Sequence, residues 1–535
     1  VLLEPLTSPA GADSATLPVD EMLATNLARI EGIEIASVPS GGALATALDA
    51  RAALRISGSV ARRGGAVRLD LRLVDRADGR IRRGIVVEER DLFAAVDQAT
   101  AELAEALGRR VPASPLSNVS TASLAAFEYF DRGERARAGG DRARAIRWLS
   151  EAIAADTLFA LARLRLAQAF GDLDKTAAAA QLDTALAGAQ RLPERERLLL
   201  RASRALLEED PAREAFADSL VHAWPLDPNG FVIRGQTLAW RGAFLEATGA
   251  YRRAIALDVA GLERSEVSCL ACDAYEGLIT AYLLADSAAA AGQVAREWQE
   301  RQPDGGRAAA ARSVVAQFAN DLPTAAEAAR RAVELNPTDY YAGVYPAVWA
   351  IYEGESRRAL GLLEAEFVHP DPSRRQRATW FAAIAERNAG RSDYAERRLR
   401  GFIDSIPAAR VGEFATTRMH RAQALLEAGR PRDAALLFDS IAQQNGPVVS
   451  PHSIARWRAW MGVLAGDALA AAGDTLALVR RIREVEAWGV QSAYGRDRRL
   501  HHHLRGLQLR ARGDLEGARR AFEAARWSPT GSYIR

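Results

Sequence analysis

The sequence predicts an α+β protein, in which a small α/β domain at the amino end precedes a long all-α array of helical hairpins. Two observations predict this division. Apolar and polar residues alternate from Val67 to Leu73, which is the pattern of a strand with one buried face. Beyond residue 124, small and large residues instead recur at fixed spacings in one segment after another, which is typical of a helical repeat array.

The first fifty residues predict two strand–helix units. Val1–Leu6 is a short apolar run that ends at the breaker-rich segment 7–14, and apolar residues then recur at helical spacing as far as Ile30. Ile33–Val38 predicts a second strand, and an Ala-rich helix is expected over 43–53.

Three antiparallel strands and one more helix are expected to complete this domain. Gly64-Gly65 and Asp78-Gly79 provide residues that tolerate positive φ, as the turns of β-hairpins require. An amphipathic helix follows from Phe93. The expected strands cover residues 54–62, 67–75 and 80–88.

This run of residues resembles the TolB-amino-terminal-like domain of bacterial signalling proteins, also called FlgO-like. The resemblance covers about the first 110 residues and includes Ile56–Val60, the Asp78-Gly79 turn and Asp91-Leu92-Phe93 at the start of the last helix. The family usually has a tryptophan soon after that turn, where this chain has Ile81–Ile85. The resemblance implies a mixed sheet covered by a layer of two helices, without catalytic residues.

Residues 111–123 contain two prolines and several serines, which predicts a linker, and the remaining segment 124–535 is expected to be helical. Within it, a small residue in a first helix is followed at fixed offsets by small, large and small residues in a second helix. The small residues would let the paired helices approach closely, and the large ones would fill the gap between neighbouring hairpins. The clearest copies are Gly133, Ala145, Leu149 and Ala152; Gly235, Ala247, Tyr251 and Ala254; and Gly506, Ala518, Phe522 and Ala525.

These spacings resemble tetratricopeptide repeats, with about ten hairpins from residue 124 to the end. The family implies a superhelix whose inner groove binds an extended peptide or protein through the concave faces of the first helices. Aromatic residues and arginines, which interfaces favour, occupy several of the matching positions. The alternative is that they pack in the core, as aromatic residues at helical spacing more often do. The candidate groove residues are Asn229, Gln236, Trp240, Tyr341, Val344, Tyr352, Arg377, Trp380 and Arg387.

Cys269 and Cys272 are the only cysteines, and their spacing permits a disulfide, half of a metal site or two buried thiols. A zinc site would need two more ligands, and none is near in sequence. A disulfide would place this region outside the reducing cytoplasm. The segment is similar to a cysteine pair at a hairpin start in tetratricopeptide regions attached to bacterial Ser/Thr kinases of the eukaryotic-like type.

The sequence contains no recognisable catalytic motif: it lacks a phosphate-binding loop, a His-Glu-x-x-His pair, a nucleophile elbow and a kinase catalytic loop. We therefore expect no enzyme activity, no cofactor and no metal site. His501–His503 point in different directions on a helix, so they are interpreted as ordinary surface and packing residues. The net charge of +2 comes from interleaved acids and bases, which argues against a nucleic-acid partner.

The leading hypothesis is a sensor or scaffold module of a bacterial signalling protein, on the extracytoplasmic side of a membrane. No apolar run in the chain is long enough to span a bilayer, so a membrane tether would lie upstream of Val1. Two alternatives stay open: the carboxy-terminal region of a membrane-anchored Ser/Thr kinase, and a structural subunit of a larger bacterial assembly. The partner, the signal and the oligomeric state are left undetermined by the sequence.

Overall fold

The chain forms two compact units in the computed structural model. The first comprises Val1–Arg204, Ala215–Ile233 and Arg252–Ala274, and the second comprises Ala205–Glu214, Arg234–Tyr251 and Tyr275–Arg535. Residues 43–52 of the helix expected over 43–53 and the candidate groove residue Tyr341 lie outside the described residues. The structure describes residues 1–4, 6–7, 19–27, 29–30, 33, 36–37, 53–63, 65–111, 114–138, 141–171, 174–192, 194–258, 262, 269–285, 287–336, 344–369, 372–407, 414–443, 450–492 and 494–526.

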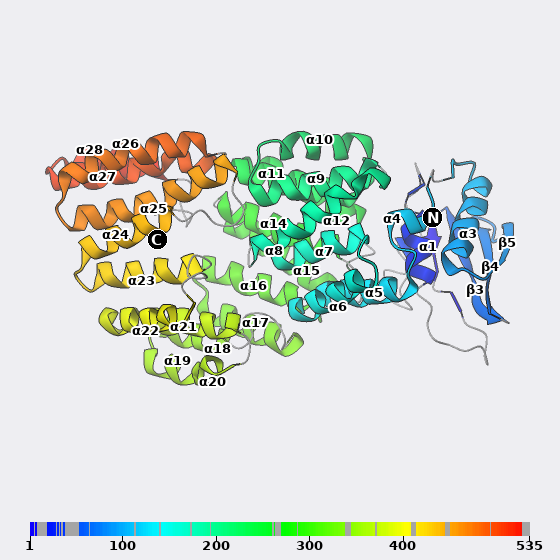
Figure 1. Cartoon of the computed structure of the whole chain (residues 1–535), viewed down its shortest axis with the longest axis horizontal. Coiled ribbons are helices and arrows are strands. Elements are labelled where there is room, and N and C mark those ends of the chain that lie inside the picture. Colours follow the sequence, from blue (N-terminus) through cyan, green and yellow to red (C-terminus); the bar gives the residue numbers. More distant parts are fainter. Residues whose placement is uncertain are drawn as a thin grey trace. The chain divides into compact units, whose positions relative to one another are not determined.

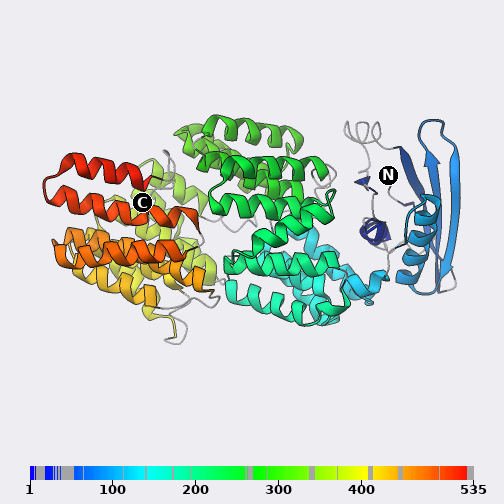
Figure 2. The same cartoon turned by 90° about the horizontal axis from the view of Figure 1, so that it is seen from above.

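A five-stranded mixed sheet lies at the amino end of the first unit, with the strand order β2-β1-β3-β4-β5 (Figures 1 and 2). The short β1 runs parallel to both β2 and β3, whereas β3, β4 and β5 form an antiparallel meander. The mixed sheet predicted from the sequence is therefore confirmed. Its strands are β1 (Leu2–Leu3), β2 (Ala36–Ser37), β3 (Leu54–Arg63), β4 (Ala66–Asp75) and β5 (Ile81–Glu89).

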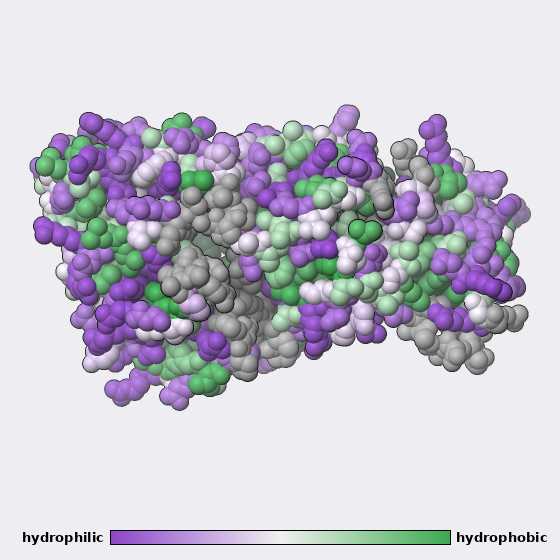
Figure 3. All heavy atoms as spheres, in the orientation of Figure 1, coloured by the Kyte–Doolittle hydropathy of each residue, from purple (hydrophilic) through white to green (hydrophobic). Residues whose placement is uncertain are grey.

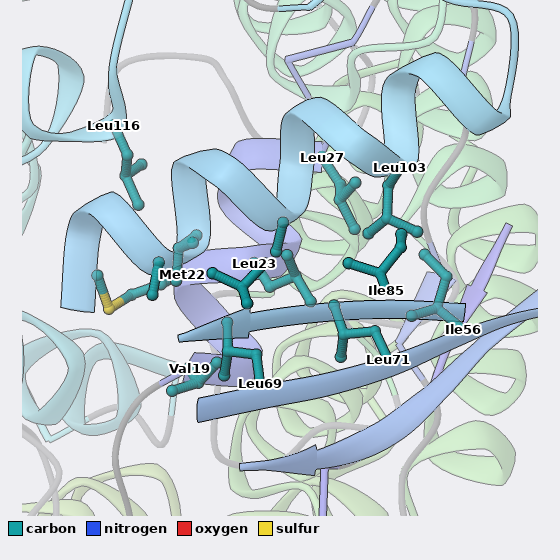
Figure 4. Close-up of a cluster of buried hydrophobic side chains, with 14 of the residues drawn as sticks. Val19, Met22, Leu23, Leu27, Ile56, Leu69, Leu71, Ile85, Leu103 and Leu116 are labelled. Carbon is teal, nitrogen blue, oxygen red and sulfur yellow. The ribbon is translucent and has the colours of Figure 1, made fainter. Parts of the chain in front are cut away.

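The core of this domain lies between one face of the sheet and the helices α1 (Val19–Leu27) and α3 (Leu92–Ala106). Figure 4 shows Leu69 and Leu71 of β4 pointing toward side chains of both helices, among them Leu103. The residues of β4 that alternate with Leu69 and Leu71 face away from this core, because successive side chains of a strand point to opposite faces of the sheet. The helices thus cover one face of the sheet.

The segment predicted as a linker is partly folded against this domain. It contains the short helix α4 (Leu116–Val119), and Leu116 is fully buried in the domain core. The carboxylate of Asp97 accepts a hydrogen bond from the backbone N–H of Leu116 at 2.9 Å, and Arg29 donates to the carbonyl oxygen of Ser114 at 2.6 Å. The proline and serine content predicts a linker, and the buried Leu116 together with these hydrogen bonds docks part of it on the domain.

The remainder of the described chain is helical, as predicted, and successive helices pair as hairpins (Figure 1). The helices up to the disulfide region are α5 (Leu124–Ala138), α6 (Arg142–Ala155), α7 (Ala160–Phe170), α8 (Lys175–Ala187), η2 (Ala189–Arg191), α9 (Glu194–Glu208), α10 (Arg213–Ala223), α11 (Pro228–Arg241) and α12 (Phe244–Leu257). Those that follow are α14 (Leu270–Leu284), α15 (Ala288–Arg301), α16 (Gly306–Phe318), α17 (Leu322–Leu335), α18 (Tyr345–Tyr352), α19 (Ser356–Leu362), α20 (Glu364–Phe367), α21 (Pro372–Asn388), α22 (Ser392–Asp404), α23 (Ala415–Glu427), α24 (Pro431–Gln443), α25 (Pro451–Ala471), α26 (Thr475–Gln491), η4 (Gly495–Arg499), α27 (Leu500–Ala511) and α28 (Leu515–Ala525). None of the described helices is both long and apolar enough to cross a membrane.

The small-to-large contacts predicted from the repeat spacing are present. A Cβ atom added to Gly133 would lie 2.7 Å from Cγ of Leu149, and one added to Gly506 would lie 2.5 Å from the ring of Phe522. Such distances leave no room for a side chain, so the backbone of each first helix lies directly against a large residue of the second. This close approach is the packing expected of tetratricopeptide hairpins.

Several hairpin turns share one backbone conformation. In seven of the hairpins whose turns the structure describes, a residue with positive φ lies two positions before the first residue of the second helix, and glycine adopts this conformation without steric cost. In several of them an aspartate then caps the second helix, as Asp321 does by accepting from the backbone N–H of Thr324. The seven residues are Gly242, Asn320, Gly354, Gly390, Gly429, Gly473 and Gly513.

Candidate partner-binding surface

The two cysteines lie at the start of α14 and are joined by a disulfide, with 2.01 Å between the sulfur atoms. Both are buried. Beside them, Asp258 accepts a hydrogen bond from the backbone N–H of Ala271 at 2.8 Å, and Asp273 lies 3.6 Å from Arg137 in an ion pair. The first turn of α14 is therefore tied to its surroundings by covalent and polar contacts. Of the three arrangements that the sequence allows for this pair, the structure contains the disulfide.

The candidate groove residues of α11 have different environments. Asn229 donates from its backbone N–H and its amide to one carboxylate oxygen of Asp227, at 3.0 and 2.9 Å, and so helps to begin the helix. Gln236 is exposed. Trp240 is half-buried, and the guanidinium carbon of Arg213 lies 3.4 Å from the centre of its ring. Of these three residues, only Gln236 is exposed.

The two described candidates at the ends of α18, Val344 before its first residue and Tyr352 as its last, differ in exposure. Tyr352 is 51% exposed and its ring lies 5.5 Å from that of Trp349. Val344, which is 2% exposed, packs in the core between hairpins with Ala347 and Leu363. A partner does not reach Val344, so its assignment to a binding groove is corrected to the core.

The three candidates on α21 take part in packing within the array. Trp380 donates from its indole N–H to the hydroxyl of Thr417 on α23 at 2.8 Å. Arg387 pairs with Glu427, also on α23, and its Nε lies 2.7 Å from the Glu427 carboxylate. Arg377 is 1% exposed, and its assignment to the groove is likewise corrected. Val344 and Arg377 are thus buried within the array, whereas the alternative of core packing named only the aromatic residues.

Two further residues, which sequence reasoning missed, are exposed on α16. Val314 and Phe318 are each 43% exposed, and their spacing of four residues places them on one face of the helix. Phe318 lies five residues after Ser313, the small residue whose buried hydroxyl donates to the carbonyl oxygen of Ala325 in the second helix at 2.9 Å. The sequence alone contains this spacing, so it could have identified Phe318 as a candidate.

The same offset places Tyr352 five residues after the buried Ala347, at the equivalent position of the next first helix. The two first helices are held together by Trp349, which packs with Ala316 of α16 and Ala325 of α17. We call Val314, Phe318 and Tyr352 the first-helix patch. On the face of the molecule that Figure 3 shows, hydrophobic and hydrophilic residues are interspersed.

A second feature that sequence reasoning missed is a contact between distant segments of the second unit. The hydroxyls of Ser450 and Ser453, at the start of α25, donate to the carbonyl oxygen of Glu208 at 2.6 and 2.9 Å. Arg456 pairs with Glu209, which follows at the end of α9 and has a positive φ of 58°. We call these five residues the latch. The two sides of the latch, at the end of α9 and the start of α25, are more than 240 residues apart in sequence, and no local pattern indicates their contact.

Aromatic rings and buried charges surround the latch. The ring of Tyr494 lies 5.2 Å from that of Trp240, and the guanidinium of Arg456 lies 4.4 Å from the Tyr494 ring. Asp497 is fully buried nearby and accepts a hydrogen bond from Ser492 at 2.7 Å. Burial raises the pKa of Asp497 to about 6, although Ser492 and neighbouring arginines oppose the shift.

The paired helices and their glycine contacts define an array of helical hairpins, preceded by a small α/β domain at the amino end. No family model matches the sequence, and no curated protein matches it. The resemblance of the amino-terminal domain to the TolB-like family therefore stays a prediction.

Solved structures with similar helical arrangements include a tetratricopeptide repeat protein from Parabacteroides merdae, with a TM-score of 0.36 and 14% identity over 49% of this chain and 97% of that one. Yeast Tom70 matches with a TM-score of 0.41 and 12% identity over 80% of this chain and 92% of its own. The Cut9–Hcn1 hetero-tetramer of the APC/C matches with a TM-score of 0.39 and 13% identity over 83% of each chain. The fold class rests on the hairpin contacts described above.

Proposed function

We propose that this chain is a non-enzymatic scaffold or sensor module of a bacterial signalling protein, and that it binds a partner protein or peptide along the first helices of its repeats. The observation that carries the proposal is the first-helix patch. Phe318 and Tyr352 project into solvent at equivalent positions of consecutive first helices. Burying a side chain of this size completely stabilises a complex by about 1.5–3 kcal/mol relative to leaving it exposed.

The chemistry of the patch defines the kind of partner. Two aromatic rings and the valine at Val314 favour apolar side chains, and the ring of Trp349 lies 5.5 Å from that of Tyr352. Aromatic anchors of this kind dominate the energy of many protein interfaces. We expect a peptide segment or protein surface with at least two apolar side chains.

Photo-crosslinking in the native host tests the proposal. A benzophenone side chain at position 318 should crosslink one defined protein, which is then purified and titrated against the chain. The Phe318→Ala, Tyr352→Ala double variant should bind it at least about tenfold more weakly, because two aromatic anchors are lost. Leu436→Ala is the matched control, because Leu436 is 69% exposed but lies on a second helix, α24. Equal affinity of the double variant and the wild type would refute the proposal.

We also propose an extracytoplasmic location, as part of a membrane-tethered protein. The disulfide between Cys269 and Cys272 supports this location, because such bonds persist in oxidising compartments and are rare in the cytoplasm. Native chain, unfolded without reductant, should then show no free thiols on labelling. Two labelled thiols would refute the location. The kinase alternative rests on the family resemblance of the cysteine segment, and the gene sequence upstream of Val1 tests it directly.

A further inference from the structure

Strand β5 forms one edge of the amino-terminal sheet and is nine residues long. It pairs with β4 on one side, and no other strand in the described part of the chain pairs with its outer side. An open edge of this length presents unpaired backbone N–H and C=O groups, which are a template for another strand. Exposed apolar side chains accompany it, since Val86 is 55% exposed. The question is which strand would fit.

The register with β4 defines which residues of β5 share a face. Ile85 and Val87 lie opposite Leu71 and Leu69, on the face covered by the helices, and Arg83 and Glu89 belong to the same face. Gly84, Val86 and Glu88 therefore lie on the uncovered face. The ladder is irregular near Arg82, so the regular alternation runs from Arg83 to Glu89.

This seven-residue run is complementary to itself when reversed. In an antiparallel pair of two copies centred on Val86, Arg83 of each copy lies opposite Glu89 of the other, and Ile85 lies opposite Val87. Opposite charges and apolar residues are thus matched directly across the strands, which stabilises such pairs. The two Val86 side chains would lie opposite one another and cover the apolar surface that each exposes.

Other arrangements lack this match. A parallel pair would place Arg83 beside Arg83 and Glu89 beside Glu89, and a shift of two residues would place Glu89 opposite an apolar residue. Charges on an edge strand are often a defence against pairing. Here, however, the basic and acidic ends attract one another in the antiparallel pair, and neither Arg83 nor Glu89 makes an ion pair with another residue that the structure describes.

We propose that β5 is a self-association surface, through which two copies of this chain join their sheets by antiparallel β5–β5 pairing centred on Val86. The inference is independent of the proposed partner on the first helices. A single strand pair is smaller than the roughly 1,600 Å² of a standard stable interface, so the association is weak and depends on concentration. Tethering of two chains to one membrane would raise their local concentration and favour the dimer.

A charge exchange in the full-length chain tests the pairing. Sedimentation over a concentration series should show a monomer–dimer equilibrium for the wild type. Arg83→Glu and Glu89→Arg should each weaken it by about tenfold or more, because two opposite-charge pairs become like-charge pairs in the symmetric dimer. The double variant Arg83→Glu with Glu89→Arg should restore it. Glu105→Arg, at an exposed position of α3, is the control and should leave the dimer unchanged.

Oxidative crosslinking tests the register. Val86→Cys should form a disulfide-linked dimer rapidly, because the two positions face each other across the symmetry axis. Ile81→Cys, which is as exposed on the same strand at 57%, should crosslink much more slowly. A monomer at every concentration, a dimer that neither single charge reversal weakens, or equal crosslinking at positions 81 and 86 would each overturn the proposal.

Discussion

Replacing Asp497 by asparagine should stabilise the protein at neutral pH. Asp497 has no exposed surface, and its carboxylate accepts one hydrogen bond from Ser492 at 2.7 Å. Arg496 lies 4.0 Å away, at the limit of an ion pair. Burial raises the pKa of Asp497 from 3.8 to about 6, and this effect exceeds the opposing effects of Ser492 and of Arg456 and Arg496.

The sign of the pH dependence follows from this shift. Because the folded state holds the Asp497 proton more tightly than the unfolded state, the stabilisation by this proton is complete below pH 3.8 and is lost as the pH rises through about 6. A shift of two pKa units corresponds to roughly 3 kcal/mol. Above pH 6 the folded protein therefore carries a buried charge at a cost of about that size. Asparagine is neutral and can still accept from Ser492.

The assay is thermal unfolding, followed by circular dichroism between pH 4 and pH 8. Asp497→Asn should be more stable than the wild type at pH 7.5, by up to about 3 kcal/mol, and should lose this advantage toward pH 4. Asp404→Asn makes the same chemical change at an exposed position of α22 and should have little effect at either pH. A variant that is no more stable than the wild type at pH 7.5, or that gains equally at both pH values, would refute the reasoning.

Three further predictions concern packing. Gly235→Val should lower the free energy of unfolding by about 1–3 kcal/mol or more, measured by urea denaturation, because a Cβ atom there would lie 2.6 Å from the ring of Tyr251. Cys269→Ser removes a disulfide between residues three positions apart and should cost about 2 kcal/mol on the loop-entropy estimate, seen as a lower melting temperature that reductant no longer changes. Trp380→Phe deletes the indole hydrogen bond to the buried Thr417 and should cost about 1 kcal/mol, measured by the same denaturation; unchanged stability would show that this bond contributes nothing.

The repeat contacts could be predicted from the sequence because they are local. The contact of Gly133 with Leu149 joins neighbouring helices of one hairpin, so a fixed offset is enough to identify it. The offsets also define the faces of the first helices, but they do not determine which side chains remain exposed. Arg377 and Val344 match groove positions and yet are buried, because neighbouring hairpins cover them. Phe318 is not among the predicted groove residues, although it lies five positions after the small residue Ser313, as Tyr352 does after Ala347.

Contacts between distant segments could not be predicted in this way. The docking of Leu116 on the amino-terminal domain combines its burial with the hydrogen bonds of Asp97 and Arg29, in a segment that otherwise has the composition of a linker. The pairing of Glu209 with Arg456 depends on how many hairpins turn between them, and small rotations per hairpin accumulate over that distance. Neither contact leaves a periodic pattern in the sequence.

The latch changes how a repeat array responds to force or to binding. In a simple array each hairpin contacts only its neighbours, so the array extends and bends elastically. The hydrogen bonds from Ser450 and Ser453 to Glu208, with the Arg456–Glu209 pair, tie two widely separated points of the second unit together. While they hold, the end of α9 and the start of α25 cannot separate, so these two segments of the second unit move together.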